Sequence, residues 1–251
     1  MANNKPKKRR KIWLIIVAAV LVLSVLCSAV YISDYYHASE AAMAVLEQDH
    51  SPVSIIRRDH RIDFIPEHAA AGFIFYPGGK VQFEAYAPLL EALAERGILC
   101  VMPHMPGNLS VLDINAADGI QADYPEIQDW YLGGHSLGGT CAAQYLYEHA
   151  DEYDYRGLIL LAAYSTMDLS DSDLKVLSIY GSEDSVLNMQ KYTSCLVNLP
   201  RGYVESVIDG GCHAYFGSYG EQSGDGIPTI SREEQIRLTV EAIADFVFGD
   251  S

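Results

Sequence analysis

The sequence predicts an α/β fold in which a mostly parallel sheet is covered by helices on both faces and preceded by a transmembrane helix. After a long uncharged run near the N-terminus, apolar runs of strand length alternate with segments whose apolar residues recur at helical spacing. The apolar runs are continuous, which is typical of parallel strands buried on both faces. Strands that alternate with helices form a parallel sheet between two helical layers.

The N-terminal segment has the character of a membrane anchor. Residues 1–11 include six basic residues, and residues 12–32 form a run of 21 residues without a charge. As a helix this run extends about 31 Å, enough to cross the hydrocarbon core of a bilayer. We expect a basic cytoplasmic segment over 1–11, a transmembrane anchor over 12–32 and a short helical stalk within 33–52. Small residues at 27–29 also fit the cleavage site of a signal peptide.

The charge distribution bears on location and partners. All 33 acidic residues follow the apolar run, against 11 basic residues, so the remainder of the chain carries a formal charge of −22. The positive-inside rule places the basic N-terminus in the cytoplasm and residues from 33 onward outside. The domain is therefore expected to be membrane-anchored and extracytoplasmic, or secreted if the segment is cleaved. The strong negative charge argues against a nucleic-acid partner.

The predicted domain covers residues 53–251 and begins with a β-hairpin. Its strands are expected at 53–58, 61–65, 72–76, 98–102, 130–133, 158–163, 176–180 and 204–208. Helices are expected at 83–94, near 116–122, at 140–149, at 189–199 and after Ser231, which starts a capping box. From residue 72 onward, predicted strands and helices therefore alternate, except between 158–163 and 176–180, where no helix is expected.

The motif Gly134-His135-Ser136-Leu137-Gly138 lies between an expected strand and an expected helix. A serine at a glycine-flanked turn from strand to helix is the nucleophile elbow of serine hydrolases. Side chains in place of the two glycines would collide with the neighbouring strand or helix, because the turn is tight. We therefore expect the hydroxyl of Ser136 to be exposed and reactive. His135 is interpreted as packing or hydrogen-bonding support.

A serine nucleophile needs a histidine to accept its proton and a carboxylate to orient that histidine. Asp184 follows the strand expected at 176–180, and His213 follows the strand expected at 204–208. The carboxyl ends of parallel strands meet at one edge of the sheet, where such folds bind ligands. Asp168, after the preceding strand, is the competing candidate for the acid. His104 is interpreted as a solvated loop residue.

With these residues the chain resembles the α/β-hydrolases, and specifically the serine-dependent relatives of dienelactone hydrolase grouped as α/β-hydrolase fold-5. The resemblance covers residues 53–248 and implies that Ser136 is the nucleophile, Asp184 the triad acid and His213 the general base. Dienelactone hydrolase itself has a cysteine nucleophile, so a serine esterase is the closer expectation. The oxyanion donors are expected at Leu137, after the nucleophile, and at Gly79, with Lys80 as the alternative.

The implied activity is hydrolysis of a carboxylic ester, a lactone or a thioester through an acyl-serine intermediate. An acyltransferase with the same triad, a peptidase and a non-catalytic surface binding protein are the alternatives. Only 11 residues separate Ala163 from Lys175, which leaves no room for a helical lid. We expect an open pocket for a small-molecule ester, lined by residues 104–128 and 214–230. The aromatic residues of 214–230 either line this pocket or anchor the loop.

No metal or organic cofactor is implied by the sequence. The spacing of the four cysteines outside the apolar run fits neither a zinc site nor a small disulfide scaffold. They are interpreted as buried apolar residues: Cys100, Cys141, Cys195 and Cys212.

Overall fold

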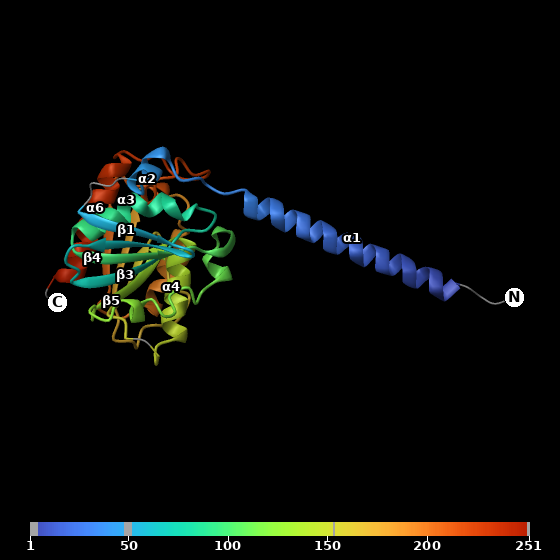
Figure 1. Ribbon diagram of the computed structural model, residues 1–251, viewed down its shortest axis with the longest axis horizontal. Coiled ribbons are helices and arrows are strands. Elements are labelled where there is room, and N and C mark those ends of the chain that lie inside the picture. The colour runs from blue at the N-terminus through green and yellow to red at the C-terminus, as the bar shows by residue number, and fades with distance from the viewer. Residues whose placement is uncertain (1–4, 48–51, 153, 250–251) are drawn as a thin grey trace. The chain divides into compact units, whose positions relative to one another are not determined.

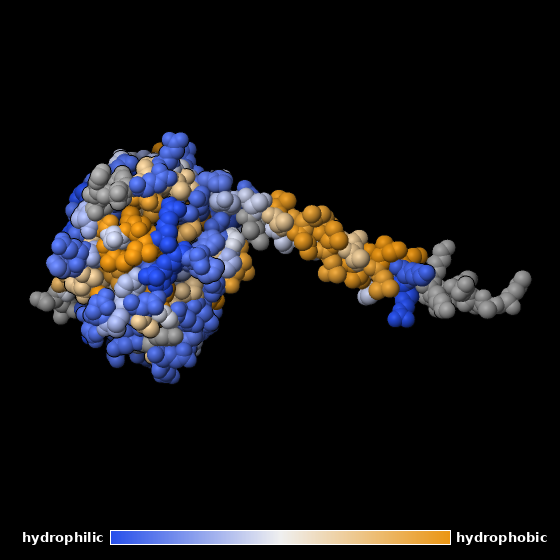
Figure 2. Space-filling model, in the orientation of Figure 1, coloured by the Kyte–Doolittle hydropathy of each residue, from blue (hydrophilic) through white to orange (hydrophobic). Residues whose placement is uncertain are grey.

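A computed structural model describes residues 5–47, 52–152 and 154–249, and the chain divides after Tyr35 into two units. The first unit contains helix α1 (Lys5–Ser33). Its stretch Arg9–Tyr31 has 23 residues and a mean hydropathy of 2.8, which is long and apolar enough for a membrane span or a signal sequence. Figure 2 shows apolar side chains along this helix beyond its basic end. A helix without a polar face suits a lipid environment.

The second unit is built on an eight-stranded sheet of order β1-β2-β4-β3-β5-β6-β7-β8 (Figure 1). β1 and β2 form the predicted antiparallel hairpin, and β2 pairs antiparallel with β4. All other pairs are parallel, as the continuous apolar runs predict. The strands are β1 (Val53–Arg58), β2 (Arg61–Pro66), β3 (Ala71–Tyr76), β4 (Ile98–Pro103), β5 (Trp130–His135), β6 (Gly157–Leu161), β7 (Lys175–Gly181) and β8 (Val204–Ile208).

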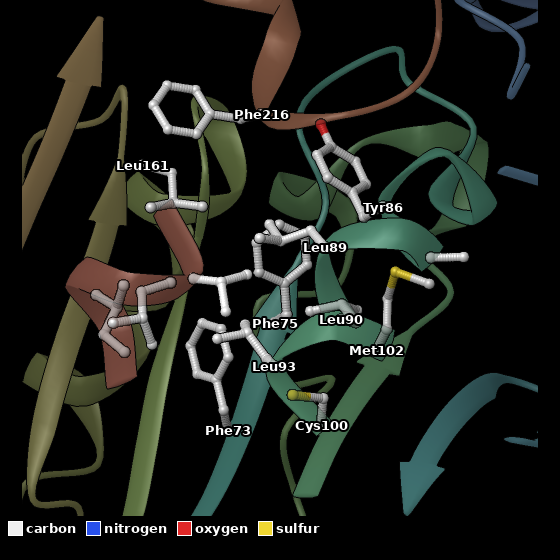
Figure 3. Close-up of a cluster of buried hydrophobic side chains, with 14 of the residues drawn as sticks. Phe73, Phe75, Tyr86, Leu89, Leu90, Leu93, Cys100, Met102, Leu161 and Phe216 are labelled. Atoms are coloured by element: carbon white, nitrogen blue, oxygen red, sulfur yellow. The ribbon is translucent and has the colours of Figure 1, made fainter. Parts of the chain in front are cut away.

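Helices cover both faces of this sheet, and each face has its own apolar core. The helices α3 (Ala87–Glu95) and α6 (Arg232–Phe248) pack on the face that carries Phe73 and Phe75, while α4 (Leu137–Glu148) packs on the face of Ile74 and Tyr76. Alternate residues of β3 therefore enter opposite cores, as the pleat of a strand requires. Figure 3 shows the first core, in which the hydroxyl of Tyr86 points away from the apolar side chains below it.

The segment between the predicted anchor and the predicted hydrolase domain differs from the expected helical stalk. The short helix α2 (Glu40–Val45) belongs to the second unit, and its residue Ala42 is fully buried there. Tyr36 forms a parallel bridge with Val81. The expected helical segment is thus reduced to six residues and packed against the domain, because it carries an apolar side that the domain buries. Residues 48–51 of the predicted stalk lie outside the described residues.

Two other predicted helices also differ. Around 116–122 the chain forms turns and a short 3-10 helix, η4 (Gln121–Asp123), because Gly119 adopts a φ of +74° that a right-handed helix does not permit. The helix expected at 189–199 is α5 (Met189–Cys195), which continues as a 3-10 turn, η5 (Leu196–Asn198). The predicted cap of α6 is confirmed, since Ser231 Oγ accepts a hydrogen bond from the backbone of Glu234 at 3.1 Å.

Candidate active site

Ser136 occupies a strained turn between β5 and α4. It directly follows the last residue of β5 and precedes the first residue of α4, with φ 52° and ψ −119°. Residues other than glycine rarely adopt positive φ, and holding one there costs on the order of 1–3 kcal/mol. The Ser136 N–H donates to the carbonyl of Leu161 at 2.9 Å, which ties the turn to the neighbouring strand β6. Such local strain is often retained at functional sites.

The two glycines of the motif are required by the end of β3. A Cβ atom at Gly134 would lie 2.3 Å from the carbonyl oxygen of Tyr76. One at Gly138 would lie 2.1 Å from the same oxygen and 2.4 Å from the carbonyl oxygen of Pro77. The predicted collision is thus found at both positions, and the obstacles are backbone atoms of the neighbouring strand and its following loop.

Asp184 and His213 form a buried hydrogen-bonded pair. His213 Nδ1 lies 2.8 Å from Asp184 Oδ2, and the two side chains are 2% and 0% exposed. The other carboxylate oxygen, Oδ1, accepts the backbone N–H groups of Val186 and Leu187 at 2.9 and 2.7 Å. Asp184 is therefore fixed by its own loop after β7, and it can hold the imidazole in one orientation and one tautomer.

Asp168, the competing acid, lies apart from this pair. Its side chain is exposed, and its Oδ1 accepts hydrogen bonds from the N–H and the hydroxyl of Ser170 at 3.1 and 2.6 Å. These bonds from Ser170 lower the pKa of Asp168 below its ordinary value. The structure therefore brings Asp184, and not Asp168, to the histidine.

His135 links the serine turn to His213. Its ring centroid lies 4.5 Å from that of His213, which places the imidazole of His213 beside the residue that precedes Ser136. His135 is buried, and its Nδ1 lies 2.8 Å from the hydroxyl of Tyr86. Burial, with the neighbouring His213 as a second cause, holds the pKa of His135 well below its ordinary value. His135 is therefore neutral and acts as support, as its position in the motif suggests.

Tyr86 is a site residue that the sequence does not reveal. Its hydroxyl accepts the N–H of Gly78 at 3.1 Å and also forms a hydrogen bond with Nδ1 of His135 at 2.8 Å. In the sequence Tyr86 is one of several apolar residues at helical spacing, and nothing distinguishes it from the core. Its signal is the buried polar atom, which becomes visible only with the tertiary contacts.

The loop after β3 leaves one N–H group available near the serine. The N–H of Gly78 bonds to Tyr86, and the N–H of Lys80 donates to the carbonyl of Asn108 at 2.7 Å. Among the described residues, the N–H of Gly79 has no such partner. A Cβ atom on Gly79 would lie 2.9 Å from Leu137 Cδ2, so Gly79 lies against Leu137. The N–H of Leu137 is at the start of α4, where no intrahelical acceptor exists.

The loop after His213 is anchored by its aromatic residues. Phe216 is fully buried, and Tyr219 is 6% exposed in the same core. The aromatic residues of this loop were expected either to line the pocket or to anchor the loop, and the burial of Phe216 and Tyr219 supports the second interpretation. A cavity of about 150 Å³ lies within the loop, lined by Cys212, Ala214 and Tyr215 among others, but not by Ser136. His104 is exposed, and its ring packs against Phe83 at 4.8 Å.

The four cysteines outside α1 are buried, as predicted, and each is a free thiol. Burial raises the pKa of Cys141 to about 11 and, together with nearby Asp225, that of Cys212 to about 12. In the described ranges, no group of three or more His, Cys, Asp or Glu side chains could hold a metal ion.

The fold is shared with several solved esterase structures. The hyperthermophilic esterase from Pyrobaculum calidifontis superposes with a TM-score of 0.58 at 15% identity, over 82% of this chain and 90% of the esterase. Est1E from Butyrivibrio proteoclasticus gives 0.53 at 16% identity, over 78% and 97% of the two chains. A thermostable esterase from Pseudomonas putida gives 0.58 at 14% identity, over 84% and 88%. At these identities the similarity establishes the fold.

The comparison with curated protein sequences gave no match. A family comparison, in contrast, matched residues 72–237, from β3 into α6, and so includes the serine turn and the Asp184–His213 pair. By this match over most of its length, the chain belongs to the alpha/beta hydrolase family.

Proposed function

We propose that this protein is a serine hydrolase that cleaves a carboxylic ester, a lactone or a thioester. The observation that carries the proposal is the buried hydrogen bond between His213 and Asp184 beside the strained turn of Ser136. Three groups from the ends of three parallel strands thus gather at one edge of the sheet, although they are far apart in sequence. This combination is what nucleophilic acyl transfer requires.

In the proposed reaction, Ser136 Oγ attacks the carbonyl carbon while His213 Nε2 takes the hydroxyl proton. Asp184 accepts the Nδ1–H of His213 and stabilises the imidazolium that forms. The proton is then donated to the leaving alcohol or thiol, which leaves an acyl-serine. Water attacks this intermediate in the second half, with His213 again accepting and returning a proton.

The oxyanion of each tetrahedral intermediate is proposed to bind the N–H groups of Gly79 and Leu137. The alternative at Lys80 is disfavoured because its N–H is already bonded to Asn108. Gly79 lies against the side chain of Leu137, and this proximity supports the two residues as donors to one oxygen. A donor of this kind contributes about 10²–10³ to kcat in enzymes where it has been removed. No cofactor takes part.

The setting proposed for the reaction follows from α1. Residues 12–32 are proposed to anchor the chain in a membrane, with the basic N-terminus in the cytoplasm and the catalytic domain outside it. If a signal peptidase removes the helix, the domain is secreted. The substrate is proposed to be a small ester that reaches an open site, because β6 and β7 are joined without an inserted lid.

Labelling with a fluorophosphonate probe tests the proposal on the full chain in detergent. The native chain is expected to be labelled, and Ser136→Ala and His213→Ala are expected to remain unlabelled. Asp184→Asn is expected to slow labelling by about 10⁴-fold, by analogy with other triads. The matched variant Asp168→Asn should label at the native rate. A folded native chain that stays unlabelled would refute the proposal, and loss only in Asp168→Asn would refute the assigned acid.

A further inference from the structure

The first residues of the catalytic unit, 36–39, lie across two loops of the candidate site, and we call them the N-terminal clamp. On one side the clamp pairs with the loop that contains Gly79. The N–H of Tyr36 donates to the carbonyl of Lys80 at 2.7 Å, and the N–H of Gln82 donates back to the carbonyl of Tyr36 at 2.8 Å. The N–H of Ala38 also donates to Gln82 Oε1 at 3.0 Å.

On its other side the clamp holds the loop that follows His213. The N–H of Ser39 donates to the carbonyl of Ser218 at 2.8 Å, and the two hydroxyls lie 2.9 Å apart. The Tyr36 hydroxyl accepts the N–H of Ser223 at 3.2 Å, and the Tyr36 ring lies 5.5 Å from that of Tyr219. The same four residues therefore bridge the loop of the proposed oxyanion donor and the loop of the proposed base.

Lys80 shows why the first of these contacts matters. It has a φ of 60°, a left-handed conformation that costs on the order of 1–2 kcal/mol for a residue with a side chain. Both of its backbone polar groups are bonded, the N–H to Asn108 and the carbonyl to Tyr36. These two bonds hold the strained residue in place from opposite sides, and the preceding residue, Gly79, is positioned with it. Without the bond to Tyr36, the chain at Lys80 can relax toward its ordinary conformation.

We propose that the N-terminal clamp is a positioning element of the active site, which aligns the Gly79 N–H with Ser136 by holding Lys80 in its left-handed conformation. The inference rests on the proposed function and extends it to a segment that immediately follows the apolar helix in sequence. It predicts that changes in the clamp lower kcat and leave KM nearly unchanged, because the oxyanion forms only after the substrate is bound.

The decisive comparison is Tyr36→Pro against Tyr36→Ala, in the full chain in detergent, with p-nitrophenyl acetate as substrate. Both variants lose the aromatic ring and the hydroxyl of Tyr36, but only the proline variant also lacks the N–H that donates to the carbonyl of Lys80. We expect kcat of Tyr36→Pro to be about tenfold below that of Tyr36→Ala, a fraction of the 10²–10³ lost when an oxyanion donor is removed, with KM values within about twofold. Equal kcat values in the two variants overturn the proposal.

A second pair keeps the test decisive if Tyr36→Pro does not fold. Gln82→Leu removes the acceptor for the Ala38 N–H, whereas Gln82→Glu retains it. The kcat of Gln82→Leu should therefore fall below the native value, and that of Gln82→Glu should stay near it. Gln128→Leu, at an exposed glutamine whose side chain donates to the carbonyl of Pro125, is the matched control and should keep native kcat. Native kcat in Gln82→Leu overturns the clamp alone, while an inactive native chain overturns the proposed function together with it.

Discussion

The Tyr86 hydroxyl is shared by two buried groups, so its removal should have a large effect for a single atom. In Tyr86→Phe, the N–H of Gly78 and Nδ1 of His135 both lose their partner, which lies at 3.1 Å from the first and 2.8 Å from the second. Tyr86 is fully buried and His135 is 1% exposed, so water cannot replace the hydroxyl without a rearrangement of the core.

The expected magnitude follows from the two unsatisfied groups. Each buried donor or acceptor left without a partner costs about 1–3 kcal/mol, and the phenylalanine recovers part of this because no hydroxyl must be buried. We therefore expect the free energy of unfolding to fall by about 3 kcal/mol, which for a domain of this size lowers Tm by about 6–12 °C. The rate of fluorophosphonate labelling should fall as well, since the loop of Gly79 and the ring beside His213 both lose a fixed contact.

Thermal and urea unfolding of the native chain, Tyr86→Phe and Tyr147→Phe provide the assay. Tyr147 is 51% exposed, so its variant should stay within about 0.5 kcal/mol of the native protein. A change of less than about 0.5 kcal/mol in Tyr86→Phe as well would show that the hydroxyl is not the shared partner described here.

Two further outcomes test the packing of the site and the state of the thiols. Gly138→Ala should abolish labelling and lower the free energy of unfolding by more than about 3 kcal/mol, because its Cβ meets backbone oxygens that cannot move aside, whereas Gly202→Ala has open space and should be neutral by the same urea assay. Burial raises the pKa of Cys141 to about 11 and of Cys212 to about 12, so above the unfolded value near 9 the unfolded chain binds fewer protons than the folded one. The contribution of these two thiols to the free energy of unfolding should therefore be constant below pH 8, and the free energy of unfolding should fall as the pH rises from 9 to 11; a rise over that interval would contradict the assignment.

Much of the sheet could be predicted because its signals are local. Continuous apolar runs bounded by glycine and proline predict the central strands within a few residues, and the mixed sequence of β8 is predicted with its observed bounds. The helices expected near 116–122 and at 189–199 are predicted from apolar spacing alone. Apolar spacing does not reveal the positive φ of Gly119 or the change from α-helix to 3-10 helix after Cys195. These are backbone properties that depend on what each segment packs against.

The candidate site likewise contains some residues that the sequence predicts and others that only the tertiary structure reveals. Ser136, Asp184 and His213 are recognisable because each follows a strand and carries the required chemistry. The contributions of Tyr86 and Tyr36 are invisible in the sequence, because both act through tertiary hydrogen bonds to residues that the chain order does not pair with them. Likewise, the proposed preference for Gly79 over Lys80 as an oxyanion donor rests on the hydrogen bond of Lys80 to the carbonyl of Asn108, which lies 28 residues beyond Lys80.

The carbonyl oxygen of Tyr76 sets the clearance at both glycines of the serine turn, and Tyr76 is also the last residue before the loop that contains Gly79. One peptide group therefore limits the space at the turn of the proposed nucleophile and also begins the loop of the proposed oxyanion donor. If β3 shifts along its axis, the serine turn and this loop must move with it in the same direction. Small distortions of the sheet, such as those that accompany substitutions in either core, should therefore move the proposed nucleophile and the proposed oxyanion donor together.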